Sequence, residues 1–138
     1  MDDRVTGREE AAAPATGPRL NIALWVLQVL LAVSFASAAF QKLGGSDYMV
    51  KLFDKIGFGT WFRYVIGLIE LVGAIGLLIP LLTGAAAVGL MLLMVGATIT
   101  NVSIGENPAS PIVFLLFTVL LVWGRWPQFE ALVLRLRN

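Results

Sequence analysis

Residues 61–82, WFRYVIGLIELVGAIGLLIPLL, constrain the fold of this chain more than any other stretch. The stretch is mostly apolar, and it is long enough to cross a bilayer, which takes roughly 20 residues. Glu70 falls near its middle, where a carboxylate costs on the order of 2.5–3.5 kcal/mol on insertion scales. The sequence therefore predicts a membrane-spanning helix that turns Glu70 towards protein or water rather than lipid.

The two faces of this predicted helix differ as that orientation requires. One face holds the positions three, four and seven residues from Glu70, which are Arg63, Ile66, Gly67, Gly73, Ala74 and Leu77. Half of these are Gly or Ala, residue types that let a second helix approach closely. The opposite face carries only large aliphatic residues suited to lipid: Val65, Leu68, Ile69, Val72, Ile75 and Ile79. We therefore expect Glu70 to face another helix inside a bundle.

The composition places the whole chain in the membrane class. Of its 138 residues, 58% are hydrophobic and 14% charged, and neither cysteine nor histidine occurs. Without these two residue types, disulfides, thiolate nucleophiles, His- or Cys-ligated haem and most zinc sites are excluded. No basic patch suited to nucleic acid is present, so we expect no nucleic-acid partner. A redox role would need an organic cofactor or a partner protein.

Apolar runs divide the chain into one membrane domain with a tail before it and a short helix after it. The domain covers residues 19–127, with four spans at about 20–40, 61–82, 84–102 and 111–126. Residues 1–18 are polar and typical of a disordered tail. The first run ends near Ala36-Ser37-Ala38, which resembles a signal-peptidase site, so a cleaved signal peptide is its alternative interpretation.

Two short segments outside the four runs are amphipathic. After Gly44-Gly45, one face of a predicted helix carries Met49, Leu52, Phe53 and Ile56, and its other face is charged. Residues 128–138 repeat this pattern with Phe129, Leu132, Val133 and Leu136. Such helices lie in the membrane interface. The predicted fold is therefore all-α, an integral membrane four-helix bundle with two short interfacial helices.

The distribution of cations gives a bias for the orientation of this bundle. Four spans put both termini on one side of the membrane, and that side holds six Lys and Arg residues against four on the other. By the positive-inside rule, we expect a multi-pass protein of the cell membrane with cytoplasmic termini.

Five polar residues form the candidate buried polar site: Glu70, Lys42, Gln28, Thr98 and Asn101. At 1.5 Å of rise per residue, the last three come within reach of the layer of Glu70. Lys42 ends the first span, from where it can pair with Glu70 or extend outward to the interface. Glu70 is then either protonated and hydrogen-bonded to Gln28 or Asn101, or ionised and paired with Lys42.

Arg63 lies two helical turns from Glu70, too far for direct contact along a straight helix. We expect it to anchor the second span at the lipid headgroups instead.

Three motifs give the chain a resemblance to a known family. Phe40-Gln41-Lys42-Leu43-Gly44 closes the first span, Gly67-Leu68-Ile69-Glu70-Leu71-Val72-Gly73-Ala74 forms the core of the second, and Gly96-Ala97-Thr98 stands near the end of the third. Over about residues 20–125 the chain resembles the DoxX-like family of small four-helix membrane proteins. Where many relatives carry a histidine near the end of the third span, this chain has Asn101, which weakens any proton or metal role there.

The resemblance implies a role beside other proteins. The family is named for a subunit linked to a thiosulfate:quinone oxidoreductase, and other members are described as membrane partners in redox or stress complexes. Three hypotheses follow: an accessory subunit that docks partner proteins and uses Glu70 as a buried polar anchor, a quinone-interacting subunit of an oxidoreductase, or a small proton-coupled transporter. No independent catalytic motif occurs, quinone is the one cofactor considered, and the lipid bilayer is the expected partner, with a homo-oligomer left open.

Overall fold

The computed structural model describes residues 17–137, in which every regular element is a helix. In chain order these are α2 (Pro18–Gly44), α3 (Asp47–Ile56), α4 (Thr60–Leu78), α5 (Thr83–Ser103), α6 (Ala109–Gly124) and α7 (Trp126–Arg137). No strand occurs in this range, which confirms the all-α class. The predicted tail at residues 1–18 lies almost wholly outside the described residues.

Three helices, α2, α4 and α5, are long and apolar enough to cross a membrane. Helix α6 has 16 residues, or about 24 Å, which is short of the ~30 Å hydrocarbon core. It meets the same criterion only together with α7, from which it is bent by 67°. The described chain therefore holds three apolar helices of membrane length, or up to four if the bent pair counts as one.

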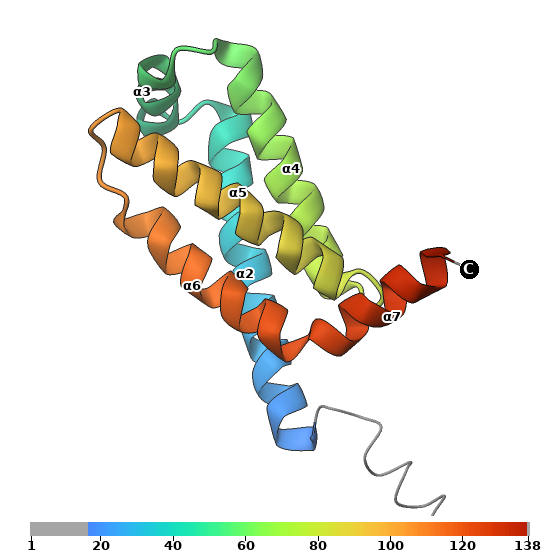
Figure 1. Ribbon diagram of the computed structural model, residues 1–138. Helices are drawn as coiled ribbons and strands as arrows, with labels where there is room; N and C mark the ends of the chain where they lie inside the picture. The colour runs from blue at the N-terminus through green and yellow to red at the C-terminus, as the bar shows by residue number, and fades with distance from the viewer. Residues whose placement is uncertain (1–16, 138) are drawn as a thin grey trace, which may run out of the picture.

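Four helices, α2, α4, α5 and α6, form a closed ring of contacts, and we call them the long helices. Helix α2 contacts α4, α4 contacts α5, α5 contacts α6, and α6 returns to α2. Figure 1 shows α3 near one end of these helices and α7 crossing the other end. Helix α3 packs on α4 and α2, whereas α7 packs on α5 and α6. The ring thus has two differently covered ends.

Burial along α4 follows its predicted faces, and the buried residues of α2 also share one face of their helix. On α4 the buried residues are Arg63, Gly67, Glu70, Ala74, Gly76 and Leu77, and the predicted lipid face is exposed throughout. On α2 they are Leu24, Gln28, Leu31, Ala32, Phe35 and Ala39. Large apolar side chains cover the outside, as at Val72, which is 66% exposed. This distribution suits helices surrounded by lipid, where polar groups must face protein.

Two helix ends differ from the sequence-based boundaries. Helix α4 ends at Leu78 rather than near residue 82, because Pro80 lacks an N–H and disfavours helical geometry in the residue before it. Helix α6 ends at Gly124, and α7 begins at Trp126 with Pro127 in its first turn, where proline is tolerated. Arg125 therefore stands at a corner between two helices rather than near the end of one span.

Helix α7 is held against α5 by a close approach at Gly84. A Cβ added at Gly84 would lie 2.8 Å from Phe129 Cβ and 2.9 Å from its backbone nitrogen. We expect Gly84→Ala to push α7 away and to destabilise its docking by about 1–3 kcal/mol, a typical cost of overpacking. Faster hydrogen exchange in residues 126–137 would show that the docking of α7 has weakened.

The matched control is Gly89→Ala in the same helix, because a Cβ there would meet nothing within 4 Å. It should leave exchange in α7 unchanged. Equal effects of the two substitutions would contradict the docking role of Gly84.

Candidate functional site

An ion pair joins the end of α2 to the middle of α4. Lys42 Nζ lies 2.5 Å from Glu70 Oε1, and the two side chains are 11% and 2% exposed. Gly67 permits this approach, because a Cβ there would lie 3.1 Å from both Lys42 Cβ and Leu43 Cγ. Of the two arrangements open for Glu70, the described residues show the one with Lys42.

Glu70 has acceptor capacity that the protein itself does not use. Its Oε1 lies 2.5 Å from the Lys42 ammonium, and among the described residues neither carboxylate oxygen accepts a hydrogen bond from any other group. A carboxylate has about four lone-pair sites, and those left without a donor in a buried position are costly. A ligand hydroxyl or a water molecule beside it would therefore be stabilised.

The ion pair lines a cavity of about 170 Å³ between the helices. Most of the lining is apolar, and it includes one phenylalanine from each of four helices: Phe35, Phe53, Phe62 and Phe114. Rings Phe35 and Phe114 are 5.1 Å apart between centroids, and Phe53 and Phe62 are 5.8 Å apart. Polar atoms come from Lys42 and Glu70, with Asn101, Ser110 and Tyr48 also at the wall. The cavity thus combines an aromatic wall with a charged pair.

Helix α3 covers this cavity. The apolar stripe from which we predicted an interfacial helix, Met49, Leu52, Phe53 and Ile56, lines the cavity in full. Ser46 begins the helix by accepting a hydrogen bond from the Met49 N–H at 3.4 Å, and Gly57 ends it with a positive φ of 84°. The stripe therefore packs over protein, and the charged face points away from it.

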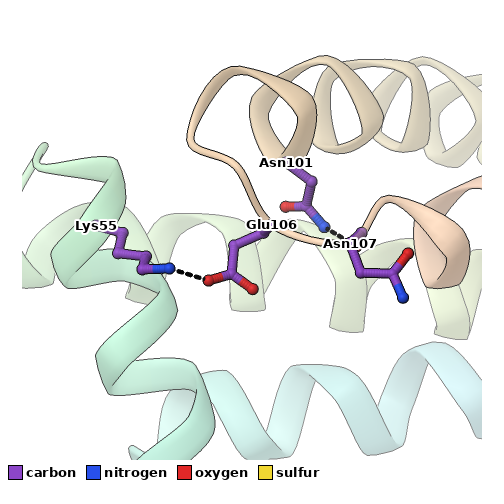
Figure 2. A network of polar contacts seen from close by, with 4 residues as sticks. All are labelled: Lys55, Asn101, Glu106 and Asn107. Carbon is purple, nitrogen blue, oxygen red and sulfur yellow. Dashed lines mark hydrogen bonds and ion pairs between the residues drawn. The ribbon is translucent and has the colours of Figure 1, made fainter.

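Asn101 holds the turn between α5 and α6 as well as lining the cavity. Its Nδ2 donates to the Asn107 carbonyl at 3.1 Å, and Asn107 Oδ1 accepts from the Ala109 N–H at 2.9 Å. In the same turn, Glu106 pairs with Lys55 of α3 (Figure 2). Asn101 is thus tied to the turn and not to Glu70.

Two further candidate residues lie apart from Glu70. Thr98 donates to the Met94 carbonyl of its own helix at 2.8 Å. Gln28 donates to the Leu77 carbonyl at 2.8 Å and accepts from Arg125 Nε at 2.7 Å. The structure brings Lys42, Glu70 and Asn101 to one cavity and leaves Gln28 and Thr98 outside it.

Gln28 belongs to a second polar cluster, which sequence reasoning missed. Arg125 is 3% exposed, and its NH1 group donates to Asn21 Oδ1 at 2.8 Å. Thr83 joins the cluster by donating to the Leu77 carbonyl at 3.1 Å. The spacing of Asn21 and Gln28 was a usable signal, because residues seven apart share one helix face. Nothing in the sequence pointed to Arg125 as their partner.

Arg63 does not reach outward as expected for a headgroup anchor. Arg63 is 7% exposed, and its NH1 group lies 3.3 Å from where a Cβ at Gly45 would stand. Its guanidinium carbon lies 5.0 Å from the centroid of the Tyr64 ring. Gly45 follows the C-terminus of α2, where a helix dipole favours a cation. The turn after α2 therefore covers Arg63.

Within residues 17–137 every regular element is a helix, and three of these helices are long and apolar enough to cross a membrane, which is typical of a small helical membrane protein. The model of the DoxX-like family matches residues 26–123, and the chain belongs to this family. No curated protein and no solved structure matches it. The matched range contains Lys42, Glu70 and Asn101.

Removing either charge of the ion pair should destabilise the fold. Lys42→Met leaves a buried carboxylate, and Glu70→Gln leaves an ammonium without a counter-ion, each costing about 3 kcal/mol. The double variant removes both charges, so its loss should be clearly smaller than the sum of the single losses. Thermal unfolding midpoints in detergent measure this.

The control for these variants is Lys51→Met on the exposed face of α3, with an expected change within about 0.5 kcal/mol. Strictly additive effects of Lys42→Met and Glu70→Gln would show that the pair contributes no coupling energy.

The second polar cluster identifies Gln28 as another residue whose substitution should destabilise the fold. Gln28→Met removes the acceptor for Arg125 Nε and the donor to the Leu77 carbonyl, which should cost about 1–3 kcal/mol. Gln41→Met changes an exposed residue of the same helix and should be neutral. Equal unfolding midpoints for the two variants would rule out a stabilising role for this cluster.

Proposed function

We propose that this protein is a membrane accessory protein that binds a small amphipathic ring compound of the quinone type beneath α3. The observation that carries the proposal is the cavity of about 170 Å³ with phenylalanines on its wall and the Lys42–Glu70 pair at its side. An apolar cavity of about 150 Å³ in another protein takes up benzene. The cavity therefore has room for one substituted ring, and a long apolar tail attached to that ring would have to lie outside the cavity.

The charged pair offers both kinds of hydrogen-bonding group that such a ring needs. The Lys42 ammonium can donate to a quinone carbonyl, and the Glu70 carboxylate, which has acceptor sites beyond its contact with Lys42, can accept from a hydroquinone hydroxyl. The phenylalanine rings supply apolar and aromatic contact to the ring face. Both redox forms of one ligand can thus be bound by the same two side chains, which suits a subunit that serves an oxidoreductase.

Membership of the DoxX-like family and the ring of four helices support a four-span arrangement in the membrane. In this proposal α6 is the fourth span and α7 lies along the interface. The excess of Lys and Arg on the side of the termini favours cytoplasmic termini.

A second candidate function is the docking of partner proteins, with Glu70 as a buried polar anchor. It is favoured by the ion pair, because Lys42 neutralises Glu70 within the chain and no ligand is then needed. A partner enzyme that co-purifies in mild detergent and is lost in Glu70→Leu would support it. Proton-coupled transport has less support, since apolar residues such as Leu31, Ala74 and Leu77 occupy the core among the helices.

Filling the cavity tests ligand binding. Ala97 lines the cavity, so Ala97→Phe should occupy it and weaken binding of a short-chain benzoquinone at least tenfold, as measured by calorimetry in detergent. Gly96→Phe adds the same ring at the neighbouring exposed position, where a Cβ meets nothing within 4 Å, and should leave binding unchanged. Absence of benzoquinone binding to the unmodified protein, or equal loss in both variants, would refute a ligand site in this cavity.

A further inference from the structure

Helix α3 is attached to the rest of the molecule differently from the long helices. Its apolar stripe covers the cavity, and its charged face makes one ion pair among the described residues, between Lys55 and Glu106. Glu106 stands in the turn between α5 and α6, whereas the chain itself links α3 to α2 and α4 (Figure 2). This ion pair thus ties the cover to a part of the molecule to which its own links do not connect it.

We propose that α3 is a lid over the cavity and that Lys55 and Glu106 form its latch. Opening of the lid would admit the ring compound of the proposed function, on which the identity of the ligand rests, while the motion itself does not depend on that identity. The lid separates at the latch and turns about its two short links to α2 and α4.

The strength of the latch suits reversible opening. Lys55 and Glu106 are 54% and 25% exposed, so water screens their attraction, and such pairs change an equilibrium only a few-fold. The Lys42–Glu70 pair inside the cavity is far more buried, at 11% and 2%, and stays with the long helices. The molecule thus has a buried ion pair in the wall of the cavity and a more exposed one at the edge of the cover.

The links of α3 are short, and each begins with a glycine. Gly45 and Gly57 flank the helix with positive φ values of 70° and 84°, a region that other residues rarely adopt. Each link is only two or three residues long, so α3 can tilt but cannot move far from the bundle. Phe53, 7% exposed in the closed position, is the lid residue that opening would uncover.

The turn that holds Glu106 is itself connected to the cavity. Asn101 lines the cavity and donates to the Asn107 carbonyl, next to Glu106 in the chain (Figure 2). A ligand that competes for the Asn101 amide would loosen this turn and move Glu106 relative to Lys55. Occupancy of the cavity and closure of the latch are therefore linked through one side chain.

The chain has no cysteine, so a single reporter cysteine can measure the lid without any ligand. We place it in the cavity with Ala97→Cys and follow its modification by N-ethylmaleimide with mass spectrometry. Lys55→Glu sets two like charges against each other at the latch and should speed modification about two- to fivefold. The swap of both charges, Lys55→Glu with Glu106→Lys, should restore the original rate.

Lys51→Glu is the matched control, because it makes the same charge change on the same exposed face, where Lys51 has no ion pair among the described residues. It should leave the modification rate unchanged. An unchanged rate in Lys55→Glu, or a swap that fails to restore the rate, would overturn the lid.

These outcomes separate the lid from the proposed function. If Lys55→Glu changes the modification rate but the protein binds no short-chain benzoquinone, the lid is supported and the quinone site is refuted. If benzoquinone binds but the modification rate does not change in Lys55→Glu, the lid is refuted and the quinone site is still supported.

Discussion

The ion pair between Lys42 and Glu70 is the interaction on which the rest of this structure depends. A carboxylate in the middle of an apolar helix needs a partner inside the protein, and Lys42 can supply one only if the end of α2 meets the middle of α4. That requirement sets the depth of α2 relative to α4. Gly67 eases the approach, because a Cβ there would lie only 3.1 Å from Lys42 Cβ and Leu43 Cγ. The cavity exists beside this crossing, and its charged wall is the pair itself.

The molecule concentrates its polar groups at two levels, with an apolar core between them. At one level Lys42 and Glu70 border the cavity under α3, and at the other Arg125 binds Asn21 and Gln28 at the corner between α6 and α7. The first level borders a cavity and its carboxylate has acceptor sites beyond the contact with Lys42, whereas the second pairs its donors and acceptors within the chain. This difference is the reason for assigning ligand binding to the first cluster and a structural role to the second.

Several features of the fold could be predicted because they depend on local patterns. The inward and outward faces of α4 follow from the spacing of Gly and Ala around Glu70, and the stripe on α3 follows from four apolar residues at helical spacing. The surface that each stripe covers was not predictable in the same way. The α3 stripe satisfies an interfacial position and a cavity cover equally well, because both environments are apolar.

The sequence by itself determined that this chain is helical, that it belongs in a membrane, and that Glu70 turns inward, because hydropathy and helical period are properties of each segment alone. Only the tertiary structure decided which polar side chains contact one another. Glu70 meets Lys42, and Gln28 meets Arg125 across 97 positions of the chain. The choice depends on how far each helix is shifted and rotated against its neighbour, since one turn of 5.4 Å is enough to exchange one polar partner for another. Those shifts come from packing at contacts such as Gly67 with Leu43 and Gly84 with Phe129, which no single segment encodes.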